Sequence, residues 1–434
     1  MCGIYLTNIP FEEKVIKEKL DSISFRGPDF MGIDKIKNLT FGHLRLSILD
    51  LDSRSNQPMI HENLTIVFNG EIYNYKAIKK ELLELDYNFK TESDTEVLLI
   101  GYKHWGTAIL DKINGMFAFS IYDATTNKLF SARDRLGVKP LYYYWNNKDL
   151  EICSQIRPLL KDKKINKEAI SIFLDCMFIP SPYTIAEDIH KLPPGNYMEL
   201  DFNTNELIVK DYWNLKDVKV KDISYEEAKK ELHDLLIDAV EIRLQSDVPI
   251  GSFLSGGIDS ALVSSIAAKV SPTQINTFSI GFDDPKYDES KIAEQYAEII
   301  DSKHITTICS PEDILKLIPT LTKVYDEPFA DSSALPSLLL NKITKQYVTV
   351  ALSGDGGDES FIGYPYSDSL EKNKRIIDIP YPIRKFLSRP SLLKLFRLNS
   401  HRVRNALTTE TRNDFIENIF SRKGLLLKKK NQNW

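Results

Sequence analysis

The sequence is poor in cysteine and histidine and has no long apolar run. Its 434 residues include four cysteines and seven histidines, and the cysteines form no C-x-x-C pair. Neither a disulfide framework nor a cysteine-based zinc site is therefore expected. No stretch of about 18 apolar residues occurs, and the first residues lack the basic and then apolar pattern of a secretory signal. We expect no membrane segment and a cytoplasmic location.

An excess of positive charge is lacking as well. Lysine and arginine together number 56 against 61 aspartates and glutamates, which gives a formal net charge of -5. This balance argues against a protein that binds nucleic acid through bulk charge. A phosphate-binding loop of the form G-x-x-x-x-G-K-S/T is also absent, which argues against a P-loop kinase or ATPase. The expected ligands are small molecules.

Two patterns of predicted secondary structure divide the chain. The first part is β-rich, with strands expected at 4–7, 64–68, 116–122, 129–133 and 141–144 and helices near 12–23, 76–85 and 95–102. From about residue 224 helices alternate with strands at 250–254, 276–280, 304–308 and 348–352, which is typical of a parallel sheet covered on both faces. We predict an α+β domain at 1–200, a linker at 201–223, an α/β domain at 224–363 and a basic helical segment at 364–434.

The first candidate catalytic residue lies at the N-terminus. Cys2 follows Met1 and precedes Gly3, a small-residue start that favours removal of the initiator methionine. The α-amine of an N-terminal cysteine lies within reach of its thiol and, with a reference pKa of about 8, can act as its base. A disordered start is the simpler interpretation of this feature alone.

Five motifs follow Cys2 in order. They are Arg26-Gly27-Pro28-Asp29, the Gly-His-Leu-Arg-Leu-Ser-Ile run at 42–48, Asn-Gly-Glu-Ile-Tyr-Asn at 69–74, Ser-Asp-Thr-Glu at 93–96 and the segment 132–140. Singly, they could be turns, a hairpin or a helix cap. Together they resemble the class II glutamine amidotransferase domain. That resemblance implies an N-terminal nucleophile fold with the four-layer order αββα.

The resemblance also implies a role for each site residue. Cys2 would attack the side-chain amide of glutamine, and Asn69 and Gly70 would stabilise the oxyanion, by about 3 kcal/mol per donor. Arg45 is suited to pair bidentately with the α-carboxylate of glutamine, while Glu71 and Asp94 would hold its α-ammonium. The implied glutamine-binding residues are Arg45, Leu46, Ser47, Ile48, Asn69, Gly70, Glu71 and Asp94.

The α/β domain carries its own motifs where parallel strands end. Ser255-Gly256-Gly257-Ile258-Asp259-Ser260 follows an apolar strand and opens a helix. Its backbone N–H groups and helix dipole predict an anion cradle, with a plain turn and helix cap as the alternative. Behind a glutaminase domain it resembles the pyrophosphate loop of N-type ATP pyrophosphatases, whose sheet is adenine nucleotide α-hydrolase-like. Asp-Glu-Pro-Phe-Ala-Asp-Ser-Ser at 326–333 and Leu-Ser-Gly-Asp-Gly-Gly-Asp-Glu at 352–359 add carboxylates where nucleotide and Mg²⁺ would sit.

These carboxylates favour a metal ion. At a buried strand end, clustered carboxylates would repel one another unless a cation compensated them, although a solvated acidic loop is the plain alternative. By resemblance to asparagine synthetases, Asp259 and Asp358 would hold Mg²⁺, and Asp355 would occupy the catalytic position tied to aspartyl-adenylate formation. The implied ATP-binding residues are Leu254, Ser255, Gly256, Gly257, Asp259, Ser260, Ile280, Ser353 and Gly354.

The two halves together resemble a glutamine-hydrolysing asparagine synthetase. The implied reaction joins aspartate and ATP to give β-aspartyl-AMP and pyrophosphate, and ammonia from glutamine, carried through an interior passage, displaces AMP. One alternative is a glutamine-dependent ligase for another carboxylate, in surface-polysaccharide or secondary metabolism. The other is a truncated synthetase that retains only glutaminase activity or a regulatory binding function. A homodimer is compatible with each interpretation.

The resemblance weakens after residue 360. The family pattern Leu-Phe-Gly-Gly-Tyr is replaced by Ser360-Phe361-Ile362-Gly363-Tyr364. We also find no later segment in 364–434 that matches the lysine- and arginine-bearing part of the family's aspartate and pyrophosphate sites. From the sequence we therefore expect competent glutamine hydrolysis but little asparagine synthesis.

Overall fold

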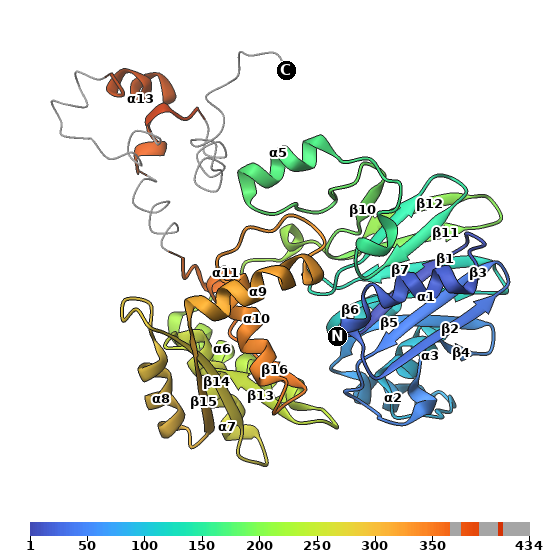
Figure 1. Cartoon of the computed structure of the whole chain (residues 1–434), viewed down its shortest axis with the longest axis horizontal. Coiled ribbons are helices and arrows are strands. Elements are labelled where there is room, and N and C mark those ends of the chain that lie inside the picture. The colour runs from blue at the N-terminus through green and yellow to red at the C-terminus, as the bar shows by residue number, and fades with distance from the viewer. Residues whose placement is uncertain (365–374, 390–406, 411–434) are drawn as a thin grey trace.

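The computed structural model describes residues 1–364, 375–389 and 407–410. A β-rich N-terminal half and a parallel-sheet half lie side by side (Figure 1). Within the described residues, no helix combines the length and apolar character needed to cross a membrane.

The N-terminal half is built on two six-stranded sheets. Sheet A has the strand order β10-β8-β9-β1-β3-β2, and sheet B the order β12-β11-β7-β6-β5-β4, with antiparallel neighbours in both. The strands of sheet A are β1 (Gly3–Thr7), β2 (Phe30–Ile36), β3 (Leu39–Arg45), β8 (Tyr142–Trp145), β9 (Leu150–Cys153) and β10 (Ile189–Lys191). Those of sheet B are β4 (Met59–His61), β5 (Leu64–Ile72), β6 (Gly115–Asp123), β7 (Lys128–Arg133), β11 (Asn196–Asp201) and β12 (Glu206–Asp211).

Alternating side chains produce the layers of this half. In β1, Ile4 and Leu6 point between the sheets and share a core with Val67 of β5, whereas Tyr5 points to the opposite face. Helix α1 (Glu13–Asp21) covers that outer face of sheet A through Ile16 and Leu20. Helices α2 (Tyr75–Glu84) and α3 (Asp94–Trp105) cover the outer face of sheet B. The predicted αββα architecture is confirmed.

A strand lies inside the linker predicted at 201–223. Strand β12 pairs with β11 over its whole length, from Asn196 opposite Asp211 to Asp201 opposite Glu206. Its charged ends and exposed edge position gave little alternating apolar signal. The remaining domain limits stay predictions.

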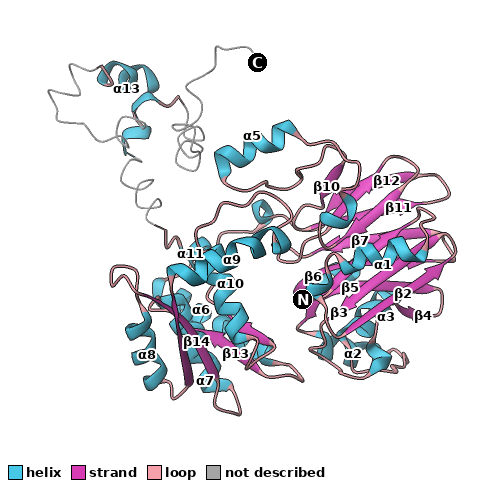
Figure 2. Ribbon diagram, viewed as in Figure 1, coloured by secondary structure: helices cyan, strands magenta, loops and turns pink. Residues whose placement is uncertain are grey.

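The second half contains a four-stranded parallel sheet in the order β15-β14-β13-β16. Its strands are β13 (Ile250–Phe253), β14 (Asn276–Phe282), β15 (Lys303–Cys309) and β16 (Val350–Leu352). The helices around it are α6 (Tyr225–Glu241), α7 (Ile258–Val270), α8 (Ser290–Ile299), α9 (Pro311–Val324), α10 (Ala334–Thr344) and α11 (Gly357–Phe361) (Figure 2). The predicted α/β domain with a parallel sheet is confirmed.

The segment 364–434 is only partly described. It contains the short helix α13 (Tyr381–Leu387). Most of the predicted basic helical segment, including the lysines at 428–430, lies outside the described residues.

Candidate active sites

Cys2 lies immediately before β1, beside the residue that follows β3. Its Sγ accepts a hydrogen bond from the Leu46 N–H at 3.4 Å, and the thiol donates to the Leu46 carbonyl at 3.7 Å. Arg26 Nε donates to the Cys2 carbonyl at 2.9 Å. Burial raises the pKa of the Cys2 thiol, because a thiolate would lose its hydration, and the Leu46 N–H opposes this only in part. The thiol therefore needs a base before it can attack.

An amine with a suitable pKa lies next to this thiol. The side chain of Met1 is exposed, but its α-amine interacts with Cys2, Arg26, Lys139 and Glu71. Burial, more than any charge, lowers the pKa of this amine from 8.0 to about 6. An amine in this environment is largely neutral at pH 7, so it can accept a proton.

Asn69 and Gly70 occupy adjacent positions in β5. The Asn69 side chain is 1% exposed, and its Nδ2 and Oδ1 have no hydrogen-bond partner among the described residues. Because buried amides are normally paired, this amide is suited to a ligand. A Cβ on Gly70 would lie 2.2 Å from the Met116 carbonyl oxygen and 2.7 Å from Phe117 Cα. Close packing against β6 therefore requires glycine at position 70.

Two acidic side chains lie near the end of β5. Asp94 begins α3 and accepts a hydrogen bond from the Ile72 N–H at 2.9 Å. Burial raises the pKa of Asp94 to about 6, although the Ile72 N–H and other donors oppose the shift. Burial, followed by the charge of Asp94, raises the pKa of Glu71 well above its usual range. A buried and a half-buried carboxyl group, both with raised pKa values, favour a bound cation, such as the ammonium of an amino acid.

Arg45 shapes the loop that follows Cys2's contact residue, Leu46. Its Nη1 donates to the Asp52 carbonyl at 3.0 Å and to Asn56 Oδ1 at 2.8 Å, while its Nη2 donates to the carbonyls of Leu49, at 3.3 Å, and Asp50. These bonds use all four Nη–H groups. The predicted bidentate contact with a glutamine carboxylate would therefore require at least one of them to break.

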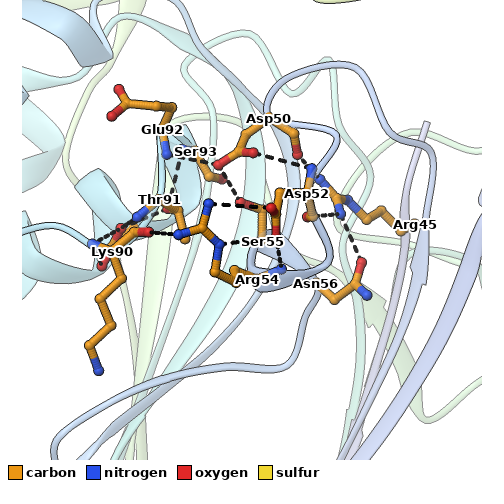
Figure 3. Close-up of polar contacts among 11 residues, drawn as sticks. Arg45, Asp50, Asp52, Arg54, Ser55, Asn56, Lys90, Thr91, Glu92 and Ser93 are labelled. Atoms are coloured by element: carbon orange, nitrogen blue, oxygen red, sulfur yellow. Dashed lines mark hydrogen bonds and ion pairs between the residues drawn. The ribbon is translucent and has the colours of Figure 1, made fainter.

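The rest of this loop is held by Asp50 (Figure 3). The Asp50 carboxylate accepts 2.7 Å hydrogen bonds from the Ser55 hydroxyl and from the Glu92 N–H, which lies just before α3. We call residues 45–56 the glutamine loop. The network in Figure 3 ties this loop to the segment that positions Asp94.

The second candidate site lies at the carboxyl edge of the parallel sheet. The loop after β13 is folded by its two serines: the Ser255 N–H donates to Ser260 Oγ at 3.0 Å, the two hydroxyls lie 2.8 Å apart, and the Gly257 N–H donates to Ser255 Oγ at 3.1 Å. No side chain caps the start of α7 at Gly257. The first N–H groups of α7 are thus oriented toward this exposed edge and are suited to an anion.

The loop after β16 packs directly on the loop after β13. A Cβ on Gly357 would lie 2.4 Å from Asp259 Oδ2, and one on Gly354 would lie 2.7 Å from the Ser260 nitrogen. The pairing of β13 with β16 explains this contact, because parallel neighbours end at the same edge. The structure thus brings Asp259, Ser260 and the segment 353–358 together.

The carboxylates of this edge are more exposed than expected. Asp355 and Glu359 are exposed, and Asp259 and Asp358 are half-buried, so these carboxylates do not form the buried cluster from which the sequence favoured a cation. In the part of the chain that the structure describes, no group of three or more His, Cys, Asp or Glu side chains is placed to hold a metal ion. The pair Asp259 and Asp358 still matches the chemistry of Mg²⁺, which commonly takes one or two carboxylates together with phosphate oxygens.

The remaining predicted residues are more scattered. Ser353 Oγ donates to Asp355 Oδ2 at 3.0 Å. Leu254 packs with Ala261, Ala293 and Ala297, whereas Ile280 packs against the cluster formed by α9 and α10. The structure does not bring these two apolar side chains into one cluster.

The acidic segment at 326–333 lies elsewhere. The carboxylates of Asp326 and Glu327 accept hydrogen bonds from residues of the N-terminal half, from Arg157 and from Ile185 and Tyr142 respectively. This corrects the expectation that they lie at a nucleotide site. Their position before an apolar helix could not reveal which domain they face.

Two residues near Cys2 had no predicted role. Arg26, in the first of the five motifs, has its Nη2 buried without a partner among the described residues. Lys139 is buried, and burial lowers the pKa of its ammonium, with Arg26 adding to the shift and Glu71 opposing it. Each of these two charged residues lies inside one of the five motifs, and this position could have indicated a role in the site. Charged side chains are seldom buried without a function or a partner.

Comparisons with known proteins fit this arrangement. A family model described as a glutamine amidotransferase domain matches residues 1–213, and one described as asparagine synthase matches residues 231–429. The chain is 36% identical to asparagine synthetase (glutamine-hydrolyzing) 1 of Bacillus subtilis, over 89% of this chain and 62% of that protein. It is 37% identical to a Methanocaldococcus jannaschii protein provisionally named asparagine synthetase (glutamine-hydrolyzing) 2, over 89% of this chain and 82% of the other. The chain belongs to the glutamine-hydrolysing asparagine synthetase family.

Proteins with other names also resemble this chain. A Gibberella zeae protein named amidase chry2 is 31% identical over 82% of this chain and 56% of that protein. Among solved structures, the glutamine phosphoribosylpyrophosphate amidotransferase of B. subtilis aligns with 71% of this chain and 82% of its own, at 15% identity and a TM-score of 0.37.

Proposed function

We propose that this asparagine synthetase family chain is a glutamine-hydrolysing, ATP-dependent amidotransferase whose acceptor is aspartate. The observation that carries the proposal is the presence of two separate sites on one chain. One surrounds Cys2, and the other joins the loops after β13 and β16. Ammonia made at the first would be used at the second.

The glutaminase half would work through the N-terminal amine of the mature chain. Removal of Met1 frees a new α-amine on Cys2, which would take the thiol proton as Sγ attacks the amide carbon of glutamine. Asn69 Nδ2, which has no competing partner, and the Gly70 N–H would stabilise the tetrahedral oxyanion. The proton then passes to the leaving nitrogen, ammonia departs, and water cleaves the thioester to glutamate. Glu71 and Asp94 hold the α-ammonium.

The synthetase half would bind ATP along the carboxyl edge of the sheet. The N–H groups at the start of α7 and the hydroxyls of Ser255 and Ser260 would contact the phosphates. Asp259 and Asp358 would hold Mg²⁺, which would neutralise part of the negative charge of the phosphates. The acceptor carboxylate attacks the α-phosphorus of ATP, pyrophosphate leaves, and ammonia then displaces AMP from the acyl-adenylate.

Aspartate as the acceptor rests on the named relatives, and the related amidase keeps a second acceptor class open. The test is a set of parallel assays with glutamine labelled by ¹⁵N at the side-chain amide, ATP and Mg²⁺. With aspartate present, the protein should form AMP, pyrophosphate and ¹⁵N-asparagine in equal amounts, and the rate of their formation relative to glutamate tests the expectation of weak synthesis. Adenylate formation that needs a different carboxylate would favour the alternative ligase, and glutamate without AMP under all conditions would exclude a synthetase. A cytoplasmic location and a homodimer stay predictions.

A further inference from the structure

An ion pair joins the two halves of the molecule at Asp326. The Asp326 carboxylate, whose side chain is 4% exposed, accepts from Arg157 Nη2 at 2.6 Å and from Nε at 2.9 Å. It also accepts from the Arg157 backbone N–H at 3.0 Å. The same Nη2 donates to the Thr322 carbonyl in α9 at 2.7 Å. One aspartate thus receives three hydrogen bonds from a single residue of the N-terminal half.

Glu327 makes a second, independent set of contacts. Its side chain is 11% exposed and lies 2.7 Å from Lys191 Nζ in β10. It accepts from the Ile185 N–H at 2.8 Å and from the Tyr142 hydroxyl, in β8, at 3.2 Å. Hydrogen-bond donors from the N-terminal half therefore surround the carboxylates of both Asp326 and Glu327. This arrangement leaves neither carboxylate free for a metal or a nucleotide.

This contact lies close to the glutaminase site. Arg26, which donates to the Cys2 carbonyl, also interacts electrostatically with Tyr142 and Asp326. Its Nη2 is buried with no partner among the described residues. The charge of Asp326 therefore acts on the same arginine that donates to the Cys2 carbonyl.

We propose that Asp326 and Glu327 form an interdomain clamp that docks the synthetase half beside Cys2 and holds the two sites in the arrangement needed for nitrogen transfer. They are positioning residues, because they act through Arg157, Lys191 and Tyr142. This inference deepens the proposed function and rests on it. A buried ion pair gains little net stability over apolar packing but costs much when one partner is removed, so it serves to fix one arrangement.

The first measurement needs no catalysis. Hydrogen exchange of the full chain is followed at the amides of Arg157 and Ile185, which donate to the two carboxylates. In Asp326→Asn and in Glu327→Gln, exchange at the corresponding amide should rise by about tenfold, because the charged acceptor is lost. Glu231→Gln, which removes the exposed Lys221–Glu231 pair, should leave both amides unchanged. Unchanged exchange in both clamp variants would overturn the proposal.

The second measurement is the ratio of glutamate formed to AMP formed. In the clamp variants, glutamine hydrolysis and ammonia-dependent AMP formation should persist, while the glutamate-to-AMP ratio with glutamine rises about threefold or more, because ammonia escapes. Arg157→Gln combined with Asp326→Asn should raise the ratio no further than either change alone, since both break one pair. A ratio equal to that of the unaltered protein would overturn the clamp as a positioning device. If the unaltered protein forms no AMP, the proposed function fails, and the exchange result still decides the docking.

Discussion

The backbone N–H of Asp50 donates a 2.7 Å hydrogen bond to the side chain of Asp247. A return bond of 3.0 Å runs from the Asp247 N–H to the Ile48 carbonyl. Ile48 and Asp50 belong to the glutamine loop, and Asp247 lies just before β13, which leads to the Ser255 loop. The two proposed sites are thus connected through the backbone by a second junction, separate from the Asp326 and Glu327 clamp.

Asp247→Ala should loosen the glutamine loop without touching the chemistry. We expect the KM for glutamine to rise by about threefold with little change in kcat for hydrolysis, because one net hydrogen bond at an exposed position is lost. Steady-state glutaminase kinetics measure this. Asp217→Ala, at an exposed aspartate whose side chain makes no hydrogen bond within the described residues, is the control. An equal KM change in both variants would contradict the proposal that Asp247 holds the glutamine loop in place.

Asn69→Ala should separate stability from activity. Because the Asn69 amide has no partner among the described residues, its removal should not lower the melting temperature, although kcat for hydrolysis should fall by about a hundredfold or more. The control is Asn74→Ala. Asn74 Nδ2 donates to the Lys112 carbonyl at 2.9 Å and its Oδ1 accepts from the Asn114 N–H at 2.8 Å, so this change should cost stability. A loss of stability in Asn69→Ala without a loss of rate would contradict the oxyanion role.

Local periodicity in the sequence was sufficient to predict many helices and strands, but it did not predict the order of the layers. The predicted strands near residues 64, 116 and 129 and the helices near 12 and 76 coincide with β5, β6, β7, α1 and α2. Among the strands that were not predicted, β2 and β12 are exposed edge strands with several charged residues, which show weak alternation. The αββα order came from the motif resemblance, since periodicity alone does not say which faces pack together.

The contacts of single charged residues depended on distant partners. Arg157 and Asp326 are 169 positions apart, so the sequence of the acidic segment could not show that it docks on the other half. Arg45 had a predicted ligand, yet its guanidinium is occupied by carbonyls of the loop that follows it. A carbonyl carries no sequence signature, and side-chain chemistry alone therefore overestimated how free this arginine is.

The pH dependence of glutamine binding should follow Asp94. Its pKa is raised to about 6, so the carboxyl group is charged above this pH and becomes neutral as the pH falls below it. A neutral carboxyl group no longer attracts the α-ammonium, and the KM for glutamine should rise by about tenfold between pH 7 and pH 5. Protonation of the N-terminal amine lowers kcat instead, because it removes the base. A KM that stays constant over this range would exclude Asp94 as the ammonium ligand.

Asp259→Asn should disable only the synthetase half. Asp259 lies against Gly357, where the loops after β13 and β16 meet. Loss of its charge should weaken Mg²⁺·ATP binding and reduce pyrophosphate release by about a hundredfold, with glutaminase activity unchanged. Asp284→Asn, in the exposed turn after β14, is the control. Full pyrophosphate release by Asp259→Asn at limiting Mg²⁺ would rule out the proposed metal ligand.

Cys2→Ala should abolish glutamine hydrolysis and leave ammonia-dependent synthesis intact, because the thiol is needed only to release ammonia. The matched control is Cys176→Ser, which alters an exposed thiol at the end of α5 (Lys167–Cys176), away from the proposed sites. Intact-mass measurement of the unaltered protein should show a chain that begins at Cys2, since a retained Met1 would convert the cysteine amine into a peptide nitrogen, which cannot accept the thiol proton. Equal loss of synthesis with both nitrogen donors in Cys2→Ala would show that the two sites are not separate, and full glutaminase activity in a chain that keeps Met1 would show that another group is the base.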